Sequence, residues 1–166
     1  MKLLQDRPHL FRGVVALGVI AIAAGCGSNS PGSASATASP AASAASGVDL
    51  EQGTATVMNA QETVLTSPDG FTLYYLTVDT TTAPKCTGAC LTNWPPLLSN
   101  GNPSSMVPLT GTLTVVMNAN GDQVAYNGHL LYRFAGDKVK GDAKGEGLQA
   151  FSGVWKVATP GLTVAG

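Results

Sequence analysis

Cys86 and Cys90 are the residues whose type and spacing point most directly to chemistry. In an oxidising compartment they can pair, because the three intervening residues can form a tight turn that brings the α-carbons within the roughly 4.4–6.8 Å that a disulfide needs. The alternative is a thiolate pair that binds copper or cycles its redox state, with His129 as the histidine available to join a metal site. We predict the structural disulfide, no metal and no cofactor.

A tyrosine followed five residues later by an aspartate occurs twice, as Tyr74 with Asp79 and as Tyr132 with Asp137. A phenol beside a carboxylate can perform acid–base chemistry or hold a ligand. On a regular strand, however, an offset of five residues places the two side chains on opposite faces. We therefore expect each aspartate to accept backbone N–H groups in its own turn, with a hydroxyl bond from a buried tyrosine to the other copy's turn as a variant.

The sequence has no further pattern typical of an active site. There is no Gly-x-Ser-x-Gly elbow, no phosphate-binding loop and no pair of carboxylates at a catalytic spacing. Trp94, Pro95 and Pro96 offer an aromatic and proline surface for a partner, although we favour a core position for this tryptophan. Residues 47–166 hold six Lys and Arg against nine Asp and Glu, so they present no basic patch for nucleic acid. We expect no enzyme.

The two Tyr and Asp pairs lie in a duplicated element. Gly70–Asp79 and Gly128–Asp137 align without a gap and share the glycine, a Leu-Tyr pair and the aspartate. The tetrapeptide Val-Met-Asn-Ala also recurs upstream, at residues 57–60 and 116–119. This self-similarity predicts one domain at residues 47–166 with two repeats, at about 53–98 and about 112–158.

Both repeats have the composition of strands, so we predict an all-β domain of two antiparallel units. Stretches with turn chemistry, rich in Asn, Asp, Gly and Pro, separate the strand segments. The loops after the two aspartates should return to Trp94 and Trp155. We expect the faces that carry Tyr74 and Tyr132 to form the shared core. The predicted strands are Thr54–Met58, Glu62–Thr66, Phe71–Val78, Leu113–Met117, Gln123–Tyr126, Leu130–Phe134 and Val154–Ala158.

The N-terminal segment predicts export and anchoring. Basic residues precede an apolar run of about a dozen residues, which is too short to span a bilayer that needs roughly 20. The ending Ala23-Ala24-Gly25-Cys26 resembles a bacterial lipoprotein box, which implies a signal peptide at 1–25 and acyl chains such as palmitate on Cys26. Two or more chains anchor stably. Residues 26–46 then form a disordered, flexible tether of small uncharged residues.

Repeats with a tyrosine, four residues and an aspartate resemble those of the bacterial secreted-repeat lipoproteins. Phe134 matches the aromatic that the stricter motif has two positions after the tyrosine, and Leu76 departs from it. Other matching segments are Cys86–Cys90, Asn93–Leu97 and Gly141–Gly147 with Trp155. The resemblance implies an architecture and an extracytoplasmic address, but no reaction. We expect a monomer that lies on the cell membrane through lipid at Cys26 and binds an envelope protein or a small ligand.

Overall fold

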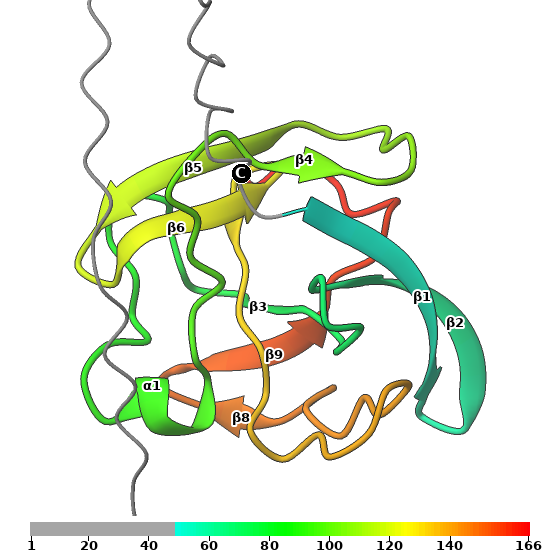
Figure 1. Ribbon diagram of the computed structural model, residues 1–166. Helices are drawn as coiled ribbons and strands as arrows, with labels where there is room; N and C mark the ends of the chain where they lie inside the picture. The colour runs from blue at the N-terminus through cyan, green and yellow to red at the C-terminus, as the bar shows by residue number, and fades with distance from the viewer. Residues whose placement is uncertain (1–48) are drawn as a thin grey trace, which may run out of the picture. The chain divides into compact units, whose positions relative to one another are not determined.

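The computed structural model describes residues 49–166, and the regular secondary structure of these residues is almost entirely β-strand (Figure 1). The predicted signal peptide, the lipidated Cys26 and the tether at 26–46 lie outside the described residues. The all-β prediction is confirmed, with one short helix added. The elements are β1 (Asp49–Val57), β2 (Ala60–Thr66), β3 (Tyr74–Leu76), α1 (Cys90–Asn93), β4 (Ser104–Ser105), β5 (Leu113–Asn118), β6 (Gly121–Tyr126), β7 (His129–Leu130), β8 (Gln149–Ala150) and β9 (Gly153–Val157).

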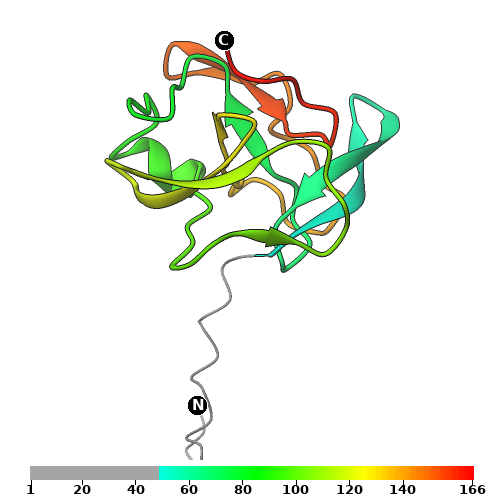
Figure 2. The ribbon, with the colours of Figure 1, turned by 90° about the horizontal axis from the view of Figure 1, so that it is seen from above.

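The described strands form three sheets of three strands, in the orders β2-β1-β4, β3-β9-β8 and β5-β6-β7. The hairpins β1-β2 and β5-β6 are the matching units of the two repeats, and both pair antiparallel. They lie on opposite sides of the domain in both ribbon views (Figures 1 and 2). The third sheet joins the repeats, because β3 comes from the first repeat and β9 from the second.

Two-residue turns close both hairpins. Met58 and Asn59 have φ values of 47° and 73°, and positive φ at both positions is typical of the type I′ turn that suits the twist of paired strands. In the second repeat the closing pair is Asn118 with Gly121, so the turn residues are Ala119 and Asn120, two positions beyond the methionine and asparagine of the recurring Val-Met-Asn-Ala segment. The recurring tetrapeptide therefore forms the turn in the first repeat but lies largely within β5 in the second.

The two strands that carry the tyrosines are shorter than the sequence predicts. Instead of Phe71–Val78 and Leu130–Phe134, the ladders cover Tyr74–Leu76 and His129–Leu130. The chain continues through isolated bridges, among them one between Tyr74 and Tyr132. The segments change neighbours along their length, so a long extended run is divided among several partners.

Two hydrophobic clusters make up the core. The first contains Tyr74 and Tyr132 with both tryptophans, so the predicted tyrosine faces do form a shared core. The second contains Leu73 and Leu131, which lie on the opposite faces of the same segments. Both faces of the duplicated element are therefore covered in both repeats.

Candidate functional site

The two motif tyrosines meet at the centre of the domain. The amide of Tyr74 donates to the carbonyl of Tyr132 at 2.9 Å, and the amide of Tyr132 donates back to the carbonyl of Tyr74 at 2.9 Å. Each tyrosine is fully buried. This reciprocal pair relates the two repeats as a two-fold axis would, and it places each side chain beside the loop of the other repeat.

Each tyrosine hydroxyl donates to the aspartate of the other repeat. Tyr74 Oη donates to Asp137 Oδ2 at 2.7 Å, and Tyr132 Oη donates to Asp79 Oδ2 at 2.6 Å. The amides of Asp79 and Asp137 bond to residues three positions earlier, so the chain turns after each tyrosine strand and the rule of opposite strand faces ceases to apply. The exchange between repeats, which the sequence offered as a variant, is the arrangement present.

The second oxygen of each carboxylate holds its own loop. Asp79 Oδ1 accepts the amide of Lys85 at 2.6 Å, and Asp137 Oδ1 accepts the amide of Lys144 at 3.0 Å. Each aspartate thus bonds to its own turn, as expected, and also to the partner repeat. Because carboxylates accept charge-assisted bonds, these four contacts are stronger than neutral ones. The two Tyr–Asp pairs, Tyr74–Asp137 and Tyr132–Asp79, are called the crossed pairs below.

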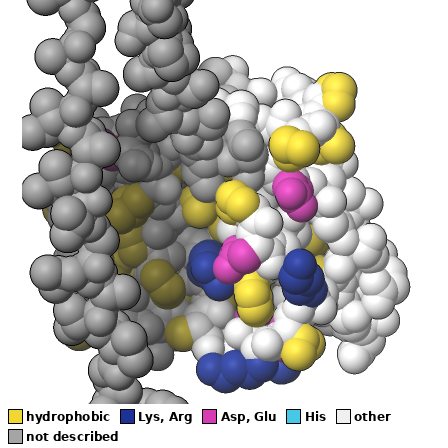
Figure 3. Space-filling view, in the orientation of Figure 1, with side chains coloured by type: hydrophobic (Ala, Val, Ile, Leu, Met, Phe, Trp, Pro, Cys, Tyr) yellow, Lys and Arg dark blue, Asp and Glu magenta, His cyan; other side chains and the backbone are white. Residues whose placement is uncertain are grey.

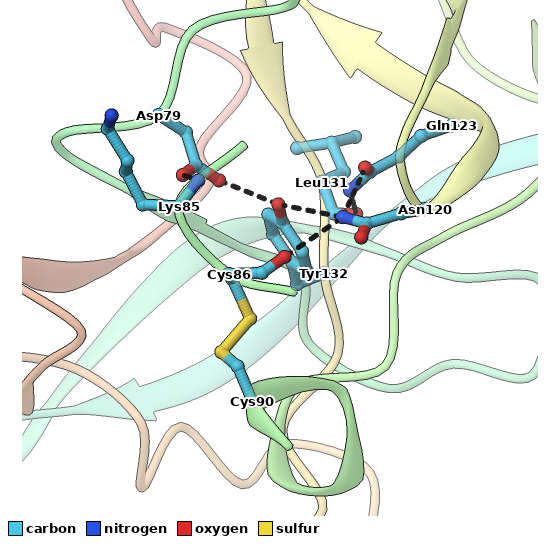
Figure 4. Close-up of a disulfide and its surroundings, with 8 residues drawn as sticks. All are labelled: Asp79, Lys85, Cys86, Cys90, Asn120, Gln123, Leu131 and Tyr132. Carbon is cyan, nitrogen blue, oxygen red and sulfur yellow. Dashed lines mark hydrogen bonds between the residues drawn. A yellow bond between two sulfur atoms is a disulfide. The ribbon is translucent and has the colours of Figure 1, made fainter. Parts of the chain in front are cut away.

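The tyrosine oxygens also accept hydrogen bonds. The amide of Gly145 donates to Tyr74 Oη at 3.3 Å, while Asn120 Nδ2 lies 3.5 Å from Tyr132 Oη. Asn120 donates further to the carbonyl of Cys86 at 3.1 Å, which ties the disulfide loop to the second crossed pair (Figure 4). Sequence reasoning missed Asn120, since an asparagine beside a hairpin turn is ordinary turn chemistry.

The electrostatics keep both hydroxyls protonated. Burial raises the pKa of Tyr74, and its bond to Asp137 raises it further. Burial and the bond to Asp79 raise the pKa of Tyr132 in the same way. Burial also raises the pKa of the Asp137 carboxyl, although its bonds to Tyr74 and to the Lys144 amide act in the opposite direction. The tyrosines are therefore hydrogen-bond donors, and neither is a base.

An aromatic stack lies beside the crossed pairs. The rings of Trp94 and Trp155 are 3.7 Å apart and 2° from parallel. Tyr74 meets Trp94 edge-on at 5.5 Å, and Tyr132 meets Trp155 edge-on at 5.2 Å. The loops that follow the aspartates do return to the tryptophans, as predicted. Phe134 stacks on the outer face of Trp94 at 4.3 Å. The equivalent residue of the first repeat is Leu76, which has no aromatic ring.

Trp94 does not form a partner surface. It is 2% exposed, because its ring is enclosed between Trp155 and Phe134, so that alternative is wrong for the tryptophan. Pro95 and Pro96 are half-buried.

An open hollow of about 440 Å³ lies elsewhere on the domain, and no ionisable side chain lines it. Its lining residues are Gln149, Ala150, Ser152, Gly153 and Val154.

Cys86 and Cys90 form the predicted disulfide, with their α-carbons 5.3 Å apart. Both are fully buried against the aromatic cluster. Thiolates for copper are thus absent in this state, and no group of three or more His, Cys, Asp or Glu among residues 49–166 is placed to hold a metal ion. His129 instead contacts the carbonyl of Thr163 at 3.1 Å and packs on Tyr75.

A comparison with models of protein families finds a match. A family model described as a secreted repeat of unknown function matches residues 55–98 and 114–159, which together make up more than half of the chain. The matched segments contain both crossed pairs and both tryptophans. No curated protein and no solved structure matches the chain.

Proposed function

We propose a role for this chain from one premise: it belongs to the family of secreted repeats of unknown function. The family description indicates an extracytoplasmic location. The proposed molecule is a lipoprotein anchored through Cys26 to the outer side of the cell membrane. Its β domain is a binding or structural module of the cell envelope, and it does not catalyse a reaction.

The crossed pairs are the observation that carries the proposal of a non-catalytic module. Tyr74 and Asp137 form a phenol–carboxylate pair of the kind that can perform acid–base catalysis, yet both are buried and hydrogen-bonded to each other. Each tyrosine oxygen also has an N–H neighbour, and each aspartate holds its own loop. A general base needs an open approach to its substrate. The hydrogen-bonding groups of these side chains are already engaged by other groups of the protein. Their role is therefore to join the two repeats.

The proposed anchor rests on the first 26 residues. A basic start, a short apolar run and a small-residue ending at Cys26 are typical of a lipoprotein signal. Within residues 49–166, no helix is long and apolar enough to cross a membrane. Two acyl chains would suffice to keep the protein on the bilayer. The tether of small residues would then separate the domain from the lipid surface.

The proposed partner is an envelope protein or a small ligand, and not a nucleic acid. On the face turned to the viewer in Figure 3, acidic, basic and apolar side chains are interspersed. Two of the lysines are already engaged, Lys144 with Asp142 at 2.7 Å and Lys156 with Glu146 at 2.6 Å. A phosphate backbone instead requires a basic stripe or patch.

Labelling of the full chain with a fatty-acid analogue in bacterial cells tests the anchor. We expect label on the wild-type chain and membrane fractionation, with both lost in the Cys26→Ser variant. The Cys86→Ser, Cys90→Ser double variant is the matched control and should keep its label, because those cysteines form the disulfide. An unlabelled wild-type chain that is released from the cells would refute the anchor.

The absence of catalysis is tested through Tyr132→Phe. If Tyr132 only joins the repeats, the variant loses stability and no reaction depends on its hydroxyl. Turnover of an envelope component by the purified wild-type protein, abolished in Tyr132→Phe while the free energy of unfolding is unchanged, would overturn the proposal.

A further inference from the structure

β5 is an edge strand with one bonded neighbour. The amide of Asn127 donates to the carbonyl of Thr112 at 2.9 Å, which makes this position a bonded pair of the ladder with β6. Bonded pairs alternate along an antiparallel ladder, so the β5 residues bonded to β6 are Thr114, Val116 and Asn118. Leu113, Val115 and Met117 therefore turn their N–H and C=O groups outward. No described residue bonds to these groups.

The first repeat shows what covers the same edge there. β1 occupies the position of β5, and its outer edge is bonded: Met106 donates to the carbonyl of Leu50 at 3.0 Å, and Thr56 donates to the carbonyl of Gly141 at 3.0 Å. β4 also pairs with the start of β1. Figure 1 shows β5 at the rim of the domain, with β6 on its inner side. Of the two equivalent outer edges, that of β1 is therefore covered and that of β5 is not.

β5 also lacks the features that normally protect an edge strand. Proteins shield exposed edges with charged side chains, proline, bulges or very short strands. The other described edges follow this rule: β4, β7 and β8 have two residues each, β3 has three, and β2 carries Glu62. β5 has six residues, Leu-Thr-Val-Val-Met-Asn, without charge or proline. Its Met117 side chain is 82% exposed.

We propose that β5 pairs antiparallel with β5 of a second copy, about a two-fold axis at Val115. In this register Val115 faces Val115 of the second copy, and Leu113 faces Met117 of the second copy. Every outward N–H and C=O then finds a partner, because the three outward residues are symmetric about Val115. The cross-strand neighbours on this face are all apolar, and no like charges meet.

The self-complementary pattern selects a second copy over a foreign strand. A two-fold interface uses the same patch on both molecules and closes as a dimer. It joins the sheets β5-β6-β7 of the two copies into one sheet and leaves the crossed pairs untouched. This dimer differs from the monomer that we expected from the sequence. The sequence alone does not show that the tertiary fold leaves the edge of β5 unpaired.

Cysteine cross-linking of the full chain in cells tests this register. Bonded partners in an antiparallel ladder have α-carbons about 5.5 Å apart, which suits a disulfide. The Val115→Cys variant should therefore form a covalent dimer. Met117→Cys is the matched control on the same strand: its two cysteines would lie about 14 Å apart, four strand residues from each other, and should form no covalent dimer. Co-expressed Leu113→Cys and Met117→Cys chains should cross-link to each other.

The Met117→Cys control distinguishes specific pairing of β5 from cross-linking by random encounter. Met117 is the more exposed of the two positions, so random encounters would cross-link Met117→Cys at least as well as Val115→Cys. Equal cross-linking of both variants overturns the proposal. A Val115→Cys chain that forms no covalent dimer overturns the proposal too. So does a Val115→Cys chain that cross-links to a different envelope protein, which would make β5 the docking strand of that protein.

Discussion

Replacing Tyr74 with phenylalanine removes one hydroxyl and keeps the ring in the aromatic cluster. Asp137 Oδ2 then loses its donor, and the Gly145 amide loses its acceptor. Asp137 is 6% exposed, so water cannot readily replace the lost bond. Leaving a buried polar partner unsatisfied costs roughly 1–3 kcal/mol, more for a charged group. We expect Tyr74→Phe to lower the free energy of unfolding by about 3 kcal/mol at neutral pH.

The pH dependence of this loss has a definite sign. Burial places the folded-state pKa of Asp137 above its ordinary value of 3.8, and the Tyr74 bond opposes that rise. Its contribution to stability is therefore present in acid and is lost as the pH rises through 3.8 toward the folded pKa. Removing the hydroxyl raises the folded pKa further. The difference between wild type and Tyr74→Phe should accordingly be larger near neutral pH than near the ordinary carboxyl pKa.

Urea unfolding followed by tryptophan fluorescence measures both effects, since Trp94 and Trp155 are buried. Tyr132→Phe is the matched control. Its acceptor Asp79 is only half-buried, so water can replace the hydroxyl, and we expect a loss of about 1 kcal/mol. A Tyr132→Phe variant less stable than Tyr74→Phe, or a Tyr74→Phe loss that grows on acidification, would refute the reasoning.

Three further outcomes are expected. Replacing Cys86 and Cys90 together with serine should lower the free energy of unfolding by about 2 kcal/mol, measured in urea without reductant, because the disulfide closes a short loop. Gly145→Ala should cost about 1–3 kcal/mol in the same assay, since its new methyl group would lie 2.7 Å from Trp94 and 2.8 Å from Tyr74. The methyl group added by Gly88→Ala would meet no atom within 4 Å, so only the φ of +56° destabilises this variant. It should therefore lose less stability than Gly145→Ala in a side-by-side thermal melt.

Each of these outcomes has a result that contradicts it. Unchanged stability of the double serine variant would mean that the disulfide does not constrain the chain. A Gly145→Ala variant as stable as Gly88→Ala would mean that the aromatic stack yields to the added methyl group.

Local chemistry explains the parts of the fold that follow from the sequence. Turn residues such as Asn127 and Gly128 punctuate the strands, and both adopt positive φ. The spacing of Cys86 and Cys90 predicted their disulfide, because four residues can be closed by a local turn. By contrast, β4 and β8 have two residues each and α1 has four, and these elements exist through their neighbours rather than through a periodic pattern.

The sequence by itself determined the duplication, the β class, the disulfide and the identity of the motif residues, since each depends on residue type and short spacing. Only the tertiary structure decided that Tyr74 bonds to Asp137 and Tyr132 to Asp79, across 63 and 53 residues. It also decided that the two tryptophans stack and that β5 keeps an open edge. These contacts depend on how one repeat lies against the other, and strand periodicity reports only the direction of a side chain within its own strand.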